Sequence, residues 1–206
     1  MTASKPFSQA SENNKNPILQ IIRRVFIRSE TVWEIGSGTG QHACFFASQL
    51  PHLFWQPTDR TENLPGINLW LTEAKLDNIK PPLALDVNDP VWPCANIEAI
   101  FTANTLHIMS AAEMEILFQK LAIYLAANAT MCIYGPFNYG GQFTSDSNAR
   151  FDNWLKQQNP LSGIRDFEQV CDLASAIGLT LIDDHEMPAN NRLLIFQRRQ
   201  DEFNRN

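Results

Sequence analysis

The residues best suited to binding a ligand lie in a glycine-rich stretch near the start of the chain. Residues 31–46 read TVWEIGSGTGQHACFF, with glycines at alternate positions and an acid just before them. Glycine lets a backbone turn tightly and approach a ligand, because no Cβ stands in the way. The β-branched and aromatic residues before the turn predict a short strand, and the apolar spacing after it predicts a helix. We expect the N-terminus of that helix to point its free N–H groups at whatever binds in the turn.

The spacing of the glycines indicates which ligand the turn suits. A dinucleotide fingerprint requires G-x-G-x-x-G, whereas Gln41 stands where its third glycine would fall. With Glu34 two residues before Gly36, the pattern resembles motif I of the class I S-adenosylmethionine-dependent methyltransferases. In that family the turn holds the methionine part of the cofactor, and the acid acts on it directly or through the turn. A dinucleotide oxidoreductase and a turn that binds nothing are the alternatives.

Two further acids follow the next two predicted strands. Asp59 comes about twenty residues after the turn, the spacing at which a βαβ unit places an acid on a ribose hydroxyl. A carboxylate can accept from both ribose hydroxyls, although a solvent-exposed acid at a strand end would look the same in sequence. Asp86 follows the third strand. The methyltransferase resemblance implies that Asp86 holds the adenine amino group and that Val87 packs on the ring.

Alternating strands and helices must position these residues. We predict a helix over 17–28, begun by Asn16 and Pro17, after an arm of residues 1–15 that is flexible unless a ligand or the domain orders it. Ser110 and Glu113 form a capping box that opens a helix to about residue 127. Further helices are expected after the glycine turn, over 64–78, around 151–155 and over 165–177. The predicted strands cover 31–35, 53–56, 83–85, 97–105, 130–134, 179–183 and 192–197.

This alternation predicts one α/β domain over residues 1–206. We expect a Rossmann-like, seven-stranded, mostly parallel sheet with helices on both faces. Its expected strand order is 3-2-1-4-5-7-6, as in the class I methyltransferases, and the closing hairpin at 188–191 makes one strand antiparallel. Ligands of such sheets lie beyond the carboxyl ends of the strands, where the glycine turn and the polar strand-end residues all fall.

The resemblance narrows when the motifs are taken together. N-x-x-P-I-L, EIGSGTGQH, WQPTD, PPLALDV, ANTLHI, YGPF, SNARFD, GIRDFE and MPANN look like the methyltransferase-like family known as domain of unknown function 938. The likeness runs from Ser11 to Arg198. It implies a fold and the cofactor S-adenosylmethionine, and it says little about the methyl acceptor. The predicted cofactor-binding residues are Glu34, Gly36, Ser37, Gly38, Gly40, His42, Asp59, Asp86, Val87 and Asn104.

Methyl transfer depends on positioning, and it needs a base only where the acceptor must lose a proton. The fourth strand ends in Asn104-Thr105-Leu106-His107, which lacks the D/N-P-P-Y of amino-group methyltransferases. It is closer to small-molecule methyltransferases, so we expect a small acceptor. His107 is a candidate general base, because imidazole titrates near neutral pH, or else it caps a helix or packs beneath the cofactor. Tyr134 is a candidate to bind the acceptor through its hydroxyl, or else it belongs to the core.

The glycine-rich segment 135–148 predicts a substrate lid that includes Tyr139 and Asn148. Asn190, in the closing hairpin, either binds the acceptor or simply tolerates a positive φ. His42 is a candidate for the carboxylate end of the cofactor or for a structural role. We expect Asn14 and Lys15 to fold over the cofactor carboxylate. The charged residues expected to anchor the lid by salt bridges are Arg150, Asp152, Arg165 and Asp166.

Composition excludes several classes of protein. The net charge of −6 gains nothing from counterion release, so nucleic acid is a poor partner. The four cysteines have no zinc spacing, so no metal site is predicted, and no apolar run matches a signal or a membrane span. We expect a cytoplasmic methyltransferase, monomer or homodimer, that acts on a small molecule. A catalytically idle cofactor-binding protein that acts through a protein partner has the same cofactor residues.

Overall fold

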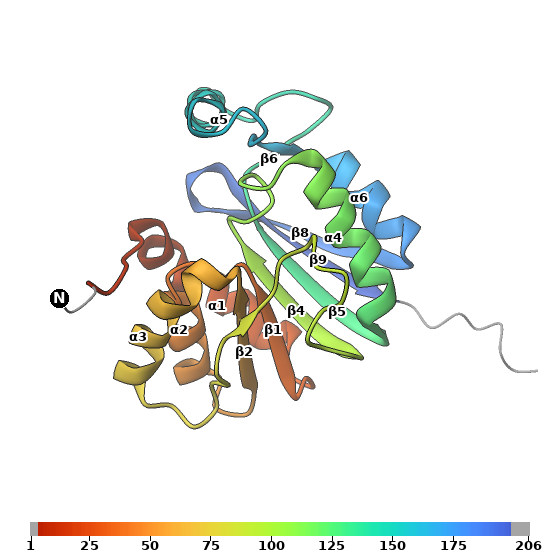
Figure 1. Cartoon of the computed structure of the whole chain (residues 1–206). Coiled ribbons are helices and arrows are strands. Elements are labelled where there is room, and N and C mark those ends of the chain that lie inside the picture. The colour runs from red at the N-terminus through yellow and green to blue at the C-terminus, as the bar shows by residue number, and fades with distance from the viewer. Residues whose placement is uncertain (1–3, 199–206) are drawn as a thin grey trace, which may run out of the picture. The chain divides into compact units, whose positions relative to one another are not determined.

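The computed structural model describes residues 4–198 as an α/β fold built on a seven-stranded sheet (Figure 1). The sheet has the order β3-β2-β1-β4-β5-β9-β8, and β6 and β7 pair in a separate two-stranded sheet. The order is therefore the predicted one, with β9 and β8 as the last two strands. The strands are β1 (Thr31–Ile35), β2 (Phe54–Asp59), β3 (Leu83–Ala84), β4 (Ile97–Ala103), β5 (Leu125–Gly135), β6 (Phe137–Asn138), β7 (Arg165–Asp166), β8 (Leu179–Met187) and β9 (Asn191–Arg198).

Neighbouring strands run parallel from β3 through β2 and β1 to β4, whereas β9 is antiparallel to both β5 and β8. The closing hairpin thus supplies the antiparallel strand that was predicted. The α-helices are α1 (Gln9–Val25), α2 (Gln41–Gln49), α3 (Leu64–Ala74), α4 (Ala111–Tyr124), α5 (Asp146–Gln158) and α6 (Phe167–Ala176). Two short 3₁₀ helices, η1 (Thr61–Asn63) and η2 (Pro188–Asn190), complete the fold.

The chain forms two compact units. Among the described residues, the first unit comprises 4–93 with Ala99–Ala103, and the second comprises Cys94–Glu98 with 104–198. The core of the first unit is aromatic. Phe46 lies 5.4 Å from Trp55 and 5.2 Å from Phe101 between ring centroids, and all three side chains are buried. This cluster packs α2 against β2 and β4.

In the second unit, the helix ends and the closing hairpin have the local conformations expected from their residues. Ser110 and Glu113 form the predicted capping box at the start of α4. Gly178 has φ +79°, the left-handed conformation expected just after α6. In the hairpin between β8 and β9, Ala189 and Asn190 have φ values of +59° and +57°. The positive φ expected of the asparagines is therefore confirmed at Asn190, and its neighbour Ala189 shares it.

The first helix begins earlier than predicted. α1 starts at Gln9, with Ser8 as its N-cap accepting a hydrogen bond from the Ser11 amide, and Pro17 lies inside it. The predicted start at residue 17 was wrong because hydrogen bonds to α2 hold the turns before Pro17, and the helix ends at Val25 and not at residue 28. The domain therefore orders most of the predicted arm. The first three residues of that arm and the polar tail from Arg199 lie outside the described residues.

The predicted lid is partly regular structure. β5 continues to Gly135, β6 follows at once, and α5 begins at Asp146 with Ser145 as its N-cap. Asn148 therefore belongs to the first turn of a helix, where it is 4% exposed, and the prediction of a loop through residue 148 was wrong. None of the helices between residues 4 and 198 is long and apolar enough to cross a membrane.

Candidate functional site

The glycine turn is tied to the end of β2. Gly36 and Ser37 both donate from their amides to the Thr58 carbonyl at 3.0 Å, and the Thr58 amide donates to the Ser37 hydroxyl at 3.2 Å. Gly36, Gly38 and Gly40 have φ values of +74°, +58° and +88°, so each occupies the region that favours glycine. The spacing of the glycines thus reflects three left-handed residues in one turn.

The last two glycines of the turn have different surroundings. A Cβ on Gly40 would lie 3.1 Å from the Ile67 Cα, so Gly40 permits close packing of α2 against α3. A Cβ on Gly38 would meet no protein atom within 4 Å. Gly38 therefore borders open space, and its backbone is accessible to a ligand. Gly40 is also the N-cap of α2, and the Gln41 amide in the first turn of that helix donates to the Thr39 hydroxyl at 3.3 Å.

Asp59 lies at the end of β2 and is 7% exposed. Its Oδ2 accepts from the Gly38 amide at 2.6 Å, and its Oδ1 accepts from the Arg60 amide at 2.7 Å and from Asn63 Nδ2 at 2.8 Å. A carboxylate has about four acceptor directions, so one is left for a ligand hydroxyl. The structure therefore joins the predicted acid directly to the most open residue of the turn.

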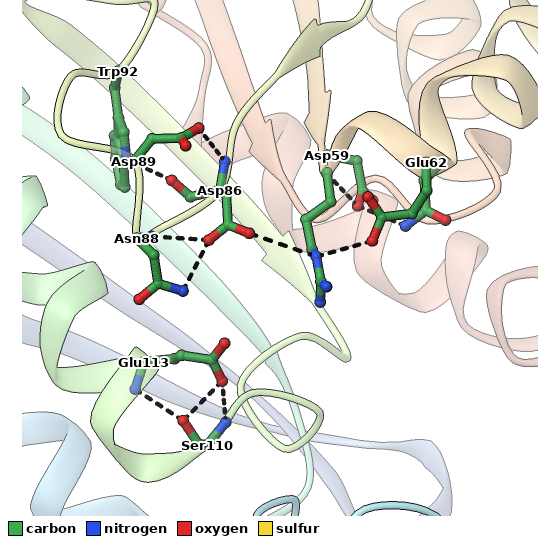
Figure 2. Close-up of polar contacts among 10 residues, drawn as sticks. Asp59, Glu62, Asp86, Asn88, Asp89, Trp92, Ser110 and Glu113 are labelled. Carbon is green, nitrogen blue, oxygen red and sulfur yellow. Dashed lines mark hydrogen bonds and ion pairs between the residues drawn. The ribbon is translucent and has the colours of Figure 1, made fainter.

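Asp86 follows β3, and its carboxylate organises the turn after that strand (Figure 2). Its Oδ1 accepts from the amide of Asn88 at 2.9 Å and from the side chain of Asn88 at 3.0 Å. Its other oxygen lies 3.6 Å from Arg60 Nε, which also pairs with Glu62 at 3.1 Å. Val87 is buried beside it. Asp86 is thus a half-exposed acid at the end of β3, next to the strand that carries Asp59.

Glu34 acts through the turn. It is 2% exposed, and its Oε2 accepts from the Ser37 hydroxyl at 2.9 Å and from Trp55 Nε1 at 3.1 Å. Burial raises the pKa of this carboxyl to about 7, against the opposing effect of the two hydrogen bonds. Of the two roles considered for this acid, the geometry favours support of the turn over direct contact with a ligand.

The raised pKa of Glu34 predicts a pH dependence of stability. Because the folded-state pKa lies above its ordinary value of 4.5, the stability contributed by this group is fully present below about pH 4.5 and is lost as pH rises through about 7. Over this whole range the loss is roughly 3 kcal/mol. Glu34→Gln keeps an acceptor oxygen and removes the titration. Urea unfolding at pH 5 and pH 8 is expected to show a smaller pH effect in the variant, and an equal effect in both proteins would contradict this role.

His42 lies between α1 and α2. It is 6% exposed, its Nε2 is 2.7 Å from the Asn14 Oδ1, and its ring stacks on Phe46 at 5.1 Å. Burial lowers the pKa of the imidazole to about 4, so the ring is neutral near pH 7. A neutral ring attracts a carboxylate weakly, so these contacts favour the structural role over the predicted contact with the cofactor.

In the second unit, the end of β4 carries Asn104 and His107. Asn104 has φ +57°, and its amide donates to the Tyr134 carbonyl at 2.9 Å. His107 is 5% exposed, and its ring lies edge-on to Phe151 at 5.3 Å. Burial, with a smaller effect of the Arg165 charge, lowers the pKa of His107 to about 4. Tyr134 is 3% exposed on β5. The catalytic roles of His107 and Tyr134 stay predictions.

Tyr139 is held by the sheet of the second unit. Its hydroxyl donates to Asp184 Oδ2 at 2.7 Å, and its ring stacks on Phe167 at 4.7 Å. Arg192 Nε donates to the other oxygen of Asp184 at 2.7 Å. Tyr139 therefore anchors the segment after β6 to β8 and β9, and its hydroxyl is already engaged. A contact with the acceptor stays a prediction.

After Tyr139 the chain makes a two-residue hairpin. The Tyr139 amide donates to the Gln142 carbonyl at 3.1 Å and the Gln142 amide donates back at 3.0 Å, around Gly140 and Gly141 with φ values of +56° and +70°. Positive φ at both central residues defines a type I′ turn. Glu168 Oε1 accepts from the Gly140 amide at 3.0 Å, so the tip is held as well. The predicted lid is thus a pinned hairpin followed by α5.

Asn148 and Asn190 join α5 to the hairpin between β8 and β9. Asn148 Nδ2 donates to Thr144 Oγ1 at 2.9 Å and to the Asn190 carbonyl at 3.2 Å. Asn190 Nδ2 donates to Ser147 Oγ at 3.1 Å. Both amides serve contacts within the protein, and their contact with an acceptor is untested. Sequence reasoning did not pair them, because they lie 42 residues apart.

Two of the four predicted anchors, Asp152 and Arg165, bind backbone groups. Asp152 accepts from the Ile164 amide at 2.8 Å and pairs with Lys156 at 2.6 Å. Arg165 donates to carbonyls of the loop after β4, including that of Leu106 at 3.1 Å. These two residues therefore fix the segment after α5, and the side-chain bonds that they make here do not reach the predicted lid at 135–148.

Solved structures share this fold. An O-methyltransferase family protein from Burkholderia thailandensis matches with a TM-score of 0.80 and 16% identity over 91% of this chain and 57% of its own. The S-adenosylmethionine-dependent methyltransferase SibL matches with a TM-score of 0.78 and 19% identity, over 93% of this chain and 56% of its own. An O-methyltransferase family 2 protein from Planctomyces limnophilus, in complex with apigenin, matches with a TM-score of 0.78 and 15% identity, over 91% of this chain and 58% of its own. The chain thus spans little more than half the length of these proteins.

The strand order, the glycine turn and these matches define the fold of a class I S-adenosylmethionine methyltransferase-like protein. Within that class the family is also shown. Residues 5–198 match the profile described as Protein of unknown function (DUF938), and the chain belongs to that family.

Proposed function

We propose that this chain binds S-adenosylmethionine and transfers its methyl group to a small molecule. The observation that carries the proposal is the pairing of Asp59 with the Gly38 amide at 2.6 Å, beside open space. An acid from β2 and an open glycine turn after β1 meet at the carboxyl ends of adjacent parallel strands, where ligands of such sheets bind.

The residues present fit the parts of this cofactor. Gly38 leaves room for the methionine end beside the turn. Asp59 retains an acceptor direction for a ribose hydroxyl, and Asp86 with the buried Val87 offers an acceptor and an apolar surface suited to adenine. When bound, the cofactor supplies a methyl group already activated on a positively charged sulfur. The protein then has mainly to position the acceptor.

His107 and Tyr134 are the proposed contacts for the acceptor. With a pKa of about 4, the His107 imidazole is neutral near pH 7 but is a weak base. This favours hydrogen bonding to the acceptor over complete removal of a proton. A small acceptor is supported by the Asn-Thr-Leu-His end of the fourth strand. It is also in keeping with the structural relatives, which include mitomycin 7-O-methyltransferase.

Calorimetry tests the cofactor. S-adenosylmethionine and S-adenosylhomocysteine are expected to bind with dissociation constants on the order of micromolar, equivalent to about −8 kcal/mol, and NAD is expected to give no heat of binding. If neither S-adenosylmethionine nor S-adenosylhomocysteine binds, the proposal is wrong. Tight binding of NAD would instead support the dinucleotide alternative.

Labelled methyl transfer separates an enzyme from an idle cofactor-binding protein. Incubation with a metabolite extract and labelled donor is expected to give a labelled small molecule. The Asn104→Ala variant is expected to lower the yield at least about tenfold, since positioning provides much of the rate. A protein that binds cofactor but labels nothing across a broad set of acceptors would favour the regulatory alternative.

A further inference from the structure

The N-terminal half of α1 lies along the first turn of α2. The Gln41 side chain receives a hydrogen bond from the Ser8 amide at 2.5 Å and donates to Glu12 Oε1 at 2.7 Å. One residue further along α2, His42 is bonded to Asn14. Gln41 directly follows the last glycine of the turn, so these bonds hold α1 next to the residues proposed to bind the cofactor.

Glu12 and Lys15 form an ion pair on this face of α1. Lys15 Nζ bonds to Glu12 Oε2 and lies 5.0 Å from the centre of the Phe45 ring. The hydrogen bond from Lys15 is the largest effect that lowers the pKa of Glu12, so the acid is ionised near pH 7. Both side chains are partly exposed, at 29% for Glu12 and 23% for Lys15, and a ligand can reach them.

Gln41 connects this pair to the turn. Its Oε1 is 3.0 Å from the Thr39 hydroxyl, and its Nε2 binds Glu12. Gln41 is 2% exposed, and its amide is shared between the turn and α1. The charged groups are therefore held at the turn through a buried hydrogen-bonded side chain, while α2 itself contains no charged residue.

One negative and one positive group side by side are the complement of a free α-amino acid. Such a group carries an ammonium and a carboxylate on one carbon, and this is the form of the methionine end of the donor. We propose that Glu12 binds the ammonium and Lys15 the carboxylate of that end. On binding, each of the two side chains exchanges its partner in the ion pair for one charged group of the ligand. The inference rests on the proposed function, and it assigns recognition of the amino-acid end of the donor to Glu12 and Lys15.

The alternative is an ion pair that only supports the helix. A partly exposed pair three residues apart stabilises a helix by about 0.2–0.5 kcal/mol, so its removal should scarcely affect folding. Contacts to a charged ligand group are worth more, and they act only on ligands that carry the amino-acid group. Folding and ligand choice are therefore separable readouts.

The experiment compares two ligands in calorimetry. S-adenosylhomocysteine carries the amino-acid group, whereas 5′-methylthioadenosine keeps the adenosine and the thioether and lacks it. Glu12→Gln retains an oxygen that can accept from Gln41, and Lys15→Met retains the stem over Phe45. Each is expected to weaken S-adenosylhomocysteine about tenfold and to change 5′-methylthioadenosine by less than about twofold. Glu73→Gln, which removes an acid that pairs with Lys5 at 2.5 Å in the same unit, is the matched control and is expected to bind both as the native chain does.

Thermal unfolding accompanies each variant and is expected to change little. The inference is overturned if both ligands weaken equally, because the pair then acts on the turn as a whole. It is also overturned if neither ligand weakens, or if Glu73→Gln has the same effect as Glu12→Gln. A native chain that binds neither ligand overturns the proposed function, and the inference with it, so the two failures are distinguished by the first titration.

Discussion

Asp59→Ala is expected to weaken S-adenosylhomocysteine binding by about a hundredfold, or roughly 2.7 kcal/mol. The substitution removes the acceptor proposed for a ribose hydroxyl. It also removes the 2.6 Å bond that orients the Gly38 amide, and thereby disturbs the turn. A single hydrogen bond to a charged group is worth about 1.5–3 kcal/mol, and the second loss places the expected effect in the upper part of that range. Calorimetry below the unfolding temperature of the variant measures the effect directly.

Two controls make the Asp59 result interpretable. Asp59→Asn keeps the volume and one oxygen, so it is expected to lose less affinity than the alanine variant. Asp77→Ala changes an exposed acid after α3 in the same unit and is expected to bind normally. Folding must be followed as well, because the alanine variant leaves Asn63 Nδ2 and two backbone amides without their acceptor. Native affinity in a folded Asp59→Ala protein would show that the end of β2 does not touch the ligand.

The fold could be predicted because its signals are local. Each parallel strand is a short apolar run closed by a turn signal, and the alternation with amphipathic helices allows few topologies. The start of α1 was missed because its cause is distant in sequence. Gln41 binds Ser8 and Glu12, which lie 33 and 29 residues away, and these bonds hold a helix across Pro17 that local preference would have ended.

The place of the candidate residues at the ends of the strands could be predicted, but their contacts could not. Glu34, Gly38 and Asp59 could be placed on the chain's first strands and turn because the spacing of a strand–turn–helix unit fixes them relative to one another. The partners of these residues follow from packing. Nothing in the sequence indicated that Asp59 would accept from Gly38, or that Tyr139 would bind Asp184, 45 residues later. Such pairs depend on how distant strands and loops meet, and apolar periodicity carries no information about that.

The two glycines that end the turn should respond in opposite ways to alanine. Gly38→Ala is expected to weaken S-adenosylhomocysteine at least about thirtyfold, because its Cβ would enter open space that we assign to the ligand. The cost to folding is limited to the left-handed φ of +58°, about 1–2 kcal/mol. Gly40→Ala adds a contact of 3.1 Å with the Ile67 backbone to its φ of +88°, so we expect a larger loss of stability, about 2–4 kcal/mol.

Urea unfolding and calorimetry on both variants measure the contrast. If the turn binds the donor, Gly38→Ala loses more binding energy than folding energy, and Gly40→Ala loses more folding energy than binding energy. The comparison cancels the strain that both variants share, because each places an alanine at positive φ in the same turn. A folded Gly38→Ala protein that binds S-adenosylhomocysteine as the native chain does would mean that the ligand does not use the open side of the turn. The glycines would then serve only the packing of α2 against α3 and the tie to β2.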